Sequence, residues 1–294
     1  MFSPGARVAG AYVACFVLWG STWLMIRLGL RDLPPLTFAG ARMALAAALL
    51  TPLALRHGLR SLPGSRWALV GAVGLLQIGL AYALLFAAQQ WVPSGLAAVL
   101  FATFPVWIVL SARVLLPGHR LTARQIVACV LGVAGVALLQ LRALGEQAVP
   151  VNATLGGLLI VAAAIIVAVA NICARRWLHE VPAVLTTWGQ VGSGAIFLLL
   201  LAVALERGAT PLWTPRAIGV LVYLAVFGTV LPYLALFWLL PRVPMAAIGA
   251  IPLLDTTVAV ALGAIVLAEP VGWNFAAGGV MVMGAAAVAN LEGR

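Results

Sequence analysis

The sequence predicts an all-α membrane protein with ten transmembrane helices, arranged as two inverted-topology five-helix repeats around a central cavity. Hydrophobic residues make up 64% of the 294 residues and charged residues only 8%, whereas a soluble domain carries about 25% charged residues. The chain also divides into ten apolar runs, each near the roughly 20 residues that a bilayer core requires. Finally, a short motif recurs between the two halves.

The recurring motif aligns residues 82–93 with residues 233–244 at a constant offset. Its matched pairs are Tyr82 with Tyr233, Phe86 with Phe237, and Pro93 with Pro244. Because each half holds an odd number of spans, the second half must insert upside down relative to the first. We therefore expect one repeat over residues 1–145 and an inverted repeat over residues 146–294. Inverted repeats of this kind build the midplane sites of many secondary transporters.

Each span is predicted from an apolar run, and proline or glycine marks most of the breaks between runs. In chain order the spans are 8–29, 35–55, 66–88, 93–115, 123–140, 155–176, 183–204, 216–239, 244–267 and 274–291. The breaks fall at Pro34-Pro35, Pro63-Gly64, Pro93, Pro117-Gly118, Pro150, Pro182, Pro211 with Pro215, Pro241 with Pro244, and Pro270. The first run is too long for a signal-peptide core, so we expect it to be retained as a span.

Arginine sets the expected orientation. All seventeen basic residues are arginine, with eleven on the side of the N-terminus and five on the other. The positive-inside rule then places both termini in the cytoplasm of a multi-pass protein of the inner (cytoplasmic) membrane. The net charge of +10 is too dispersed to suggest nucleic-acid binding. The cysteines lie in apolar runs and the histidines in separate loops, so we expect no metal site.

Polar and aromatic side chains on shared helix faces define the expected transport path, because polar groups within spans usually face the bundle interior. The candidates are Trp19, Thr22, Trp23, Gln77, Ile78, Tyr82, Phe86, Thr103, Phe104, Trp107, Thr229, Tyr233 and Phe237. Depth along the helices places Tyr82 toward the outer mouth and Tyr233 toward the inner mouth, one near each gate. The aromatic residues could equally serve packing or an interfacial belt. Gln77, Asn171 and Gln190 are weaker candidates, because such residues more often form interhelical hydrogen bonds.

Two ionisable residues lie deep within spans. At about 1.5 Å per residue, Arg42 is roughly 10 Å from the outer end of its span and Asp255 roughly 16 Å from the cytoplasmic end. Charges at such depth cost at least a few kcal/mol, so both are functional candidates. They could pair with each other, or each could bind one end of a zwitterion. Arg42 could also anchor neighbouring carbonyls, and Asp255 could be capped or protonated at the Pro252 break.

The fifth and tenth apolar runs are rich in glycine, and small residues let helices approach closely in lipid. The residues are Gly132, Gly135, Gly278, Gly279 and Gly284. These two helices could pack together at the periphery, form a homodimer contact, or make ordinary contacts within a monomer.

Several short motifs follow one another in a fixed order. They are Trp19-Gly20-Ser21-Thr22-Trp23, residues 38–46, residues 93–105, residues 121–136 and Val266–Pro270. In order and spacing they resemble the drug/metabolite transporter superfamily with two EamA-type repeats, over nearly the whole chain. One departure is visible, because the family often ends the fourth span of each repeat with Gly-Glu. The second repeat keeps Glu269, but the first has Gly118-His119.

The resemblance implies a secondary transporter rather than an enzyme. We expect export of small organic metabolites by alternating access, with aromatic or other apolar amino acids first, as in exporters of the YddG type. A multidrug or other metabolite carrier of the same fold is the alternative. An intramembrane protease would need a histidine or two acids within its spans, and the predicted spans hold no histidine and one deep acid. The expected partners are a small-molecule substrate and the lipid bilayer, with no cofactor.

Overall fold

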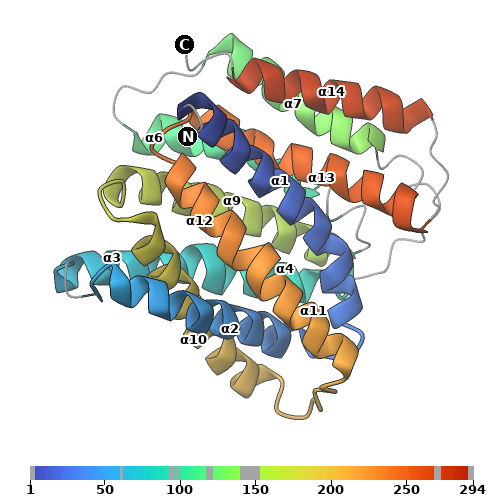
Figure 1. Ribbon diagram of the computed structural model, residues 1–294. Helices are drawn as coiled ribbons and strands as arrows, with labels where there is room; N and C mark the ends of the chain where they lie inside the picture. Colours follow the sequence, from blue (N-terminus) through green and yellow to red (C-terminus); the bar gives the residue numbers. More distant parts are fainter. Residues whose placement is uncertain are drawn as a thin grey trace.

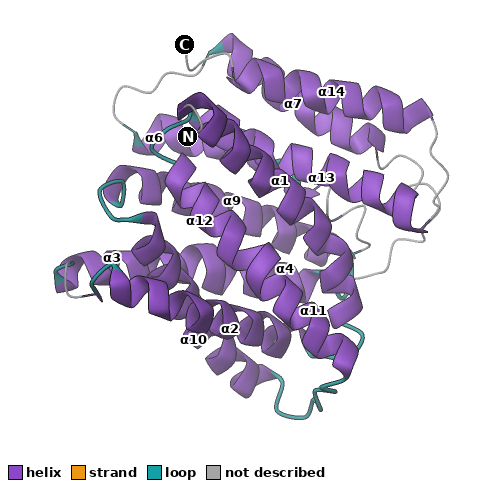
Figure 2. Cartoon of the chain, viewed as in Figure 1, coloured by secondary structure: helices purple, strands orange, loops and turns teal. Residues whose placement is uncertain are grey.

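Ten helical segments correspond one to one with the ten predicted spans in the described part of the chain (Figures 1 and 2). The structure is a computed structural model that describes residues 4–59, 62–92, 97, 100–116, 122–139, 153–267 and 273–290. In chain order the segments are α1 (Pro4–Gly29), α2 (Pro35–Arg56), α3 (Gly64–Gly74) continuing through η2 (Leu75–Leu80) into α4 (Ala81–Ala88), α6 (Phe104–Leu115), α7 (Ala123–Leu139), α9 (Ala153–Trp177), α10 (Ala183–Leu205), α11 (Pro215–Ala225) continuing through η3 (Val226–Val230) into α12 (Leu231–Leu239), α13 (Met245–Leu267) and α14 (Trp273–Asn290). The predicted boundary at residues 145 and 146 lies outside the described residues.

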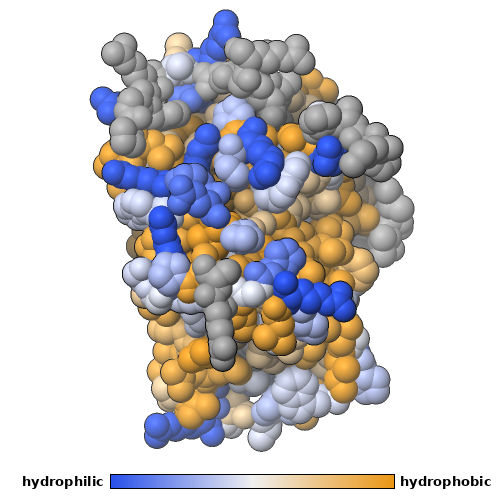
Figure 3. All heavy atoms as spheres, turned by 60° about the vertical axis from the view of Figure 1, so that its left-hand side comes forward, coloured by the Kyte–Doolittle hydropathy of each residue, from blue (hydrophilic) through white to orange (hydrophobic). Residues whose placement is uncertain are grey.

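The outer surface of the bundle suits lipid. Within the described residues, six helical segments are long and apolar enough to cross a membrane, and α6, α7 and α13 are shorter apolar helices. Many large apolar side chains point outward, among them Val114, Leu158, Ile196, Leu200 and Val203. Figure 3 shows hydrophilic residues gathered over the face turned forward, while apolar residues prevail along its right-hand flank. These exposed apolar flanks confirm the predicted class of an all-α membrane protein.

Helices of one half pack against helices of the other half, and equivalent helices make equivalent contacts. Helix α1 packs against α12 and α13, and its counterpart α9 packs against α4 and α6. Helices α2 and α10 pack together, as do α7 and α14, so each of these four meets its own counterpart. In Figure 1 the α7–α14 pair lies at the top, opposite α2, α3 and α10. This mutual packing is the arrangement expected of two inverted five-helix repeats.

The glycines of α7 serve contacts within the chain. A Cβ atom added at Gly135 would lie 2.9 Å from Met281 Cβ and 3.0 Å from the carbonyl oxygen of Gly278. One added at Gly132 would lie 2.3 Å from Leu253 Cδ1 on α13. Small residues at these two positions therefore allow the close approach of α7 to α13 and α14.

Two π-helical segments interrupt the third span and its counterpart at equivalent positions. Segment η2 begins at Leu75 and η3 at Val226, a separation of 151 residues that equals the separation between Tyr82 and Tyr233. A π turn inserts one residue, disturbs the regular backbone hydrogen bonds, and is frequent at functional sites. The sequence analysis treated both spans as uninterrupted helices, because hydrophobic periodicity in an apolar run does not register one inserted residue.

Two ion pairs join the halves at opposite ends of α2. Asp32, three residues before α2, accepts hydrogen bonds from Arg216 Nη2 at 2.6 Å and Nε at 2.9 Å, and from Thr214 Oγ1 at 2.9 Å. At the equivalent place before α10, Glu180 lies 3.3 Å from Arg66. The Asp32 side chain is 6% exposed and the Glu180 side chain 67%. A bidentate pair with a buried carboxylate holds its geometry better than an exposed single contact, so the halves are joined more firmly at Asp32.

The Asp32 pair predicts a pH-dependent stability. The hydrogen bond from Arg216, aided by the one from Thr214, holds the pKa of the Asp32 carboxyl below its ordinary value against the opposing effect of burial. Such a group stabilises the fold above its unfolded pKa of about 3.9, and the contribution is lost as the pH falls through the folded value. We expect Asp32→Asn to lower the melting temperature at about pH 6, and the difference from the unchanged protein to shrink below about pH 4.

Thermal unfolding of the detergent-solubilised protein between these pH values measures the effect. The matched control is Glu180→Gln, which removes the exposed counterpart and should change the melting temperature much less. Equal losses in the two variants, or a difference that does not vary with pH, would contradict the assignment.

Candidate functional site

A cavity lies between the two halves and receives side chains from both. It encloses about 840 Å³, counting its open mouth. Small-molecule pockets usually have mostly apolar walls with a few polar anchors. Nine of the predicted path and ionisable residues line it, namely Trp19, Thr22, Arg42, Gln77, Tyr82, Phe86, Phe104, Tyr233 and Asp255. The cavity therefore has the wall composition of a site for a small organic molecule.

Other predicted path residues lie just behind the wall. Ile78 packs on α10, where a Cβ added at Gly194 would lie 2.4 Å from its Cγ2. Phe237 stacks on Tyr233 with ring centroids 5.8 Å apart. The side chain of Trp23 lies outside the described residues. Ile78 and Phe237 share a helix face with lining residues, but both side chains are buried.

In the fourth span, Phe104 lines the cavity, whereas Thr103 and Trp107 do not. The sequence predicted Thr103, Phe104 and Trp107 on one continuous face. Instead Ala102 and Thr103 form a turn just before Pro105, and α6 begins at Phe104. Proline lacks a backbone N–H and crowds the preceding turn, so it favours a helix start here. Phe104 lines the cavity, whereas Trp107 Nε1 donates to Thr103 Oγ1 at 3.0 Å.

The two repeated tyrosines meet inside the cavity, so their predicted placement at opposite gates is wrong. The hydroxyl of Tyr233 donates to that of Tyr82 at 3.2 Å. Each ring also stacks on the phenylalanine four residues later in its own helix. Depth along a single helix does not reveal how two helices cross. Equivalent residues near a pseudo-twofold axis must come close to one another, and these two do.

Arg42 is a fully buried cation in the cavity wall. Its side chain is 1% exposed, with Nε donating to Thr229 Oγ1 at 2.9 Å and Nη2 donating to the Gly228 carbonyl at 2.8 Å. Both acceptors belong to η3, and the Gly228 carbonyl also accepts from Trp19 Nε1 at 3.2 Å. The π turn thus supplies acceptors that lipid could not supply. The third guanidinium nitrogen, Nη1, has no hydrogen-bond partner among the described residues.

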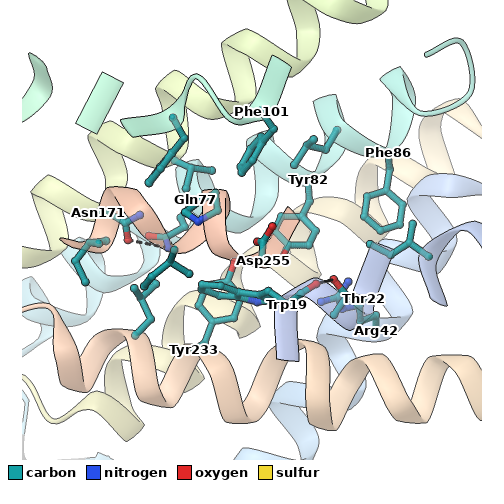
Figure 4. Close-up of a pocket in the computed structure, with 18 of the residues that line it drawn as sticks. Trp19, Thr22, Arg42, Gln77, Tyr82, Phe86, Phe101, Asn171, Tyr233 and Asp255 are labelled. Atoms are coloured by element: carbon teal, nitrogen blue, oxygen red, sulfur yellow. Dashed lines mark hydrogen bonds between the residues drawn. The ribbon is translucent and has the colours of Figure 1, made fainter. Parts of the chain in front are cut away.

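Asp255 lines the same cavity from α13. Its side chain is 6% exposed, and Figure 4 shows it between Trp19 and Tyr82. A Cβ added at Gly20 would lie 2.6 Å from the Asp255 carbonyl oxygen, so a glycine is needed where α1 crosses α13. The sequence left open whether Arg42 and Asp255 pair or bind two ends of one ligand. Both residues line the same cavity.

The sequence analysis missed ten lining residues, most of them apolar. They are Ile26, Leu85, Gln89, Phe101, Val167, Asn171, Leu236, Ile248, Ile251 and Pro252. An apolar residue in a membrane helix has the same local pattern whether it faces lipid, a neighbour or a cavity. Asn171 carried a usable signal, because an amide within a span is uncommon and seeks a partner.

A ten-helix bundle whose two equivalent halves enclose a cavity is the architecture of a membrane transport protein. Residues 8–141 and 154–291 each match the EamA-like transporter family. The chain therefore belongs to this family, and it is a multi-pass membrane transporter.

The chain is similar to several bacterial proteins. It is 29% identical over 256 residues to YedA of Escherichia coli strain K12, which is described as an uncharacterized inner membrane transporter. The match covers 86% of this chain and 81% of YedA. The chain is 25% identical over 293 residues to the uncharacterized transporter YvbV of Bacillus subtilis strain 168, covering 99% and 94% of the two chains. A crystal structure with 22% identity shares the fold, with a TM-score of 0.82 over 99% of both chains.

The anchoring of Arg42 on η3 predicts a strict size limit at Gly228. A Cβ added there would lie 2.9 Å from both Arg42 Nη2 and Thr22 Cγ2, whereas nothing lies within 4 Å of one added at Gly219. We expect Gly228→Leu to destabilise the protein by about 1–3 kcal/mol through overpacking. Gly219→Leu, on the exposed face of the same span, is the control. Melting temperatures in detergent compare the two, and equal values would contradict the anchoring geometry.

Proposed function

We propose that this transporter exports small organic metabolites, first amino acids with aromatic or other apolar side chains, across the inner membrane by alternating access. Arg42 is the observation that carries the proposal. It is a buried cation on the cavity wall, and its Nη1 has no protein partner among the described residues. Guanidinium groups bind carboxylates with strong, directional hydrogen bonds. A carboxylate is therefore the ligand group that best satisfies this wall.

The rest of the cavity suits the other parts of an amino acid. Asp255 offers a carboxylate that can receive an amino group, and it lies in the same cavity as Arg42. The aromatic rings of Trp19, Tyr82 and Phe101 offer apolar surface for a side chain. A zwitterion brings its own opposite charges, which lowers the cost of placing it in a site of low polarity.

The inverted halves support an alternating-access cycle. Inverted repeats allow one bundle to rock against the other around a midplane site. The Tyr82–Tyr233 hydrogen bond joins the halves within the cavity, and the Asp32 and Glu180 ion pairs join them at opposite ends of α2. The matched segments η2 and η3 interrupt the two spans that carry these tyrosines, and π turns are recognised places for helices to bend. Breaking one end contact while keeping the other would open one mouth.

The predicted orientation is directly testable by cysteine labelling. The three native cysteines are buried, so an introduced thiol dominates the signal from a membrane-impermeant maleimide. Because the arginine bias places both termini in the cytoplasm, Gln90→Cys should label from outside intact cells. His57→Cys, an exposed position predicted on the cytoplasmic side, is the control and should label only after permeabilisation. The reverse pattern would overturn the orientation.

Substrate counterflow in proteoliposomes tests the proposed function. The panel pairs each amino acid with the amine that lacks its carboxylate, so that a carrier of other organic molecules is detected as well. We expect Arg42→Gln to reduce amino-acid exchange at least about 30-fold, because losing one partner of a desolvated charge pair costs about 2–5 kcal/mol. Arg56→Gln makes the same change at an exposed position of the same helix and should leave exchange intact.

Arg42→Lys is a second variant that keeps the charge but loses the planar fork, and it should fall between the two. Gel filtration confirms folding of each variant before reconstitution. Unchanged exchange in Arg42→Gln, or exchange of amines without amino acids, would overturn the proposal.

A further inference from the structure

The cavity has a second polar wall, formed by two amide side chains. Gln77 is 1% exposed and Asn171 2% exposed, and both line the cavity. Gln77 Nε2 donates to Asn171 Oδ1 at 3.2 Å, while Gln77 Oε1 has no hydrogen-bond partner among the described residues. Leaving a buried acceptor unpaired is costly. Such an acceptor in a cavity wall points to a ligand that donates a hydrogen bond.

The amide pair lies across the cavity from Arg42. Figure 4 shows Gln77 and Asn171 at one end and Arg42 with Thr22 at the other. The rings of Trp19 and Tyr82 lie between the two ends in the same view. The cavity thus has Arg42 at one end and an uncharged amide pair at the other, with aromatic rings and Asp255 between them.

Equivalent positions in the two repeats carry different side chains, which makes the two ends of the cavity different. Gln77 in η2 corresponds to Gly228 in η3, at the same separation of 151 residues that relates the two tyrosines. Likewise Gln190 is the eighth residue of α10, as Arg42 is of α2. A Cβ added at Gly74, next to η2, would lie 2.4 Å from Gln190 Cα. Helix α2 of one half therefore places the cation Arg42 against η3 of the other half. Helix α10 places the neutral amide Gln190 beside η2 in the equivalent way.

We propose that Gln77, oriented by Asn171, is a specificity residue that accepts a hydrogen bond from the side chain of the transported amino acid. The inference rests on the proposed function, because Arg42 must hold the carboxylate for the side chain to reach Gln77. The matching ligand class is an aromatic amino acid with a donor on its ring, such as a phenol hydroxyl or an indole N–H. A site built to pair such a donor discriminates against the analogue that lacks it, because the acceptor is then left unpaired.

The test compares tyrosine with phenylalanine, which differ by one hydroxyl. Competition against radiolabelled phenylalanine on the detergent-solubilised protein measures both affinities. We expect the unchanged protein to bind tyrosine about five- to ten-fold more tightly, the value of one net hydrogen bond. Gln77→Met keeps the length of the side chain but removes its hydrogen bonding, and should bring the ratio near one.

Two further variants complete the experiment. Asn171→Leu removes the residue that orients Gln77 and should lower the ratio in the same way, which keeps the test valid if Gln77→Met fails to fold. Gln90→Met makes the same change at an exposed position beyond α4 and should retain the preference. A ratio near one in the unchanged protein, or one that survives both cavity variants, overturns this inference alone. Binding of neither amino acid overturns the proposed function and this inference together.

Discussion

A cation buried in a membrane protein must be solvated by the protein itself, and much of this structure follows from that requirement at Arg42. A guanidinium in the bilayer core costs at least a few kcal/mol unless it finds acceptors. Segment η3 supplies them, because its π turn presents the Gly228 carbonyl and the Thr229 hydroxyl to the same side chain. Gly228 must lack a side chain for Arg42 and Thr22 to fit beside it. The resulting contact ties α2 of one half to the eighth span of the other.

The same local architecture occurs in both halves, but the side chains on it have diverged. The π segments, the tyrosines and the acidic residues before α2 and α10 all recur at equivalent positions. Yet Gln190 occupies the position equivalent to Arg42. Likewise, the buried bidentate pair of Asp32 with Arg216 corresponds to the exposed single contact of Glu180 with Arg66. In the proposed alternating-access cycle, equivalent backbones let the bundle rock in either direction, while unequal side chains make the two ends of the cavity different. An asymmetric substrate can then be held in one orientation.

In the proposed alternating-access cycle, the central tyrosines connect this packing to movement. Their hydroxyls meet between the halves, where any relative rotation changes the distance between equivalent atoms least. The ion pairs lie farther out, at opposite ends of α2, where the same rotation changes distances most. In the proposed cycle, the Tyr82–Tyr233 hydrogen bond is therefore suited to persist. The Asp32–Arg216 and Glu180–Arg66 ion pairs are suited to break in turn, one in each state of the cycle.

The sequence by itself determined the membrane class, the ten helices and the duplicated unit, because these depend on local composition, span length and a repeated motif. It also singled out Arg42, Asp255 and the tyrosines, since a polar group within an apolar run is conspicuous. Only the tertiary structure decided that Tyr82 touches Tyr233, that Trp107 turns to Thr103, and that Gln77 and Asn171 face Arg42 across one cavity. The physical reason is that nearly every residue of a membrane helix is apolar, so helix crossing, π turns and the Pro105 turn choose the face that meets the cavity.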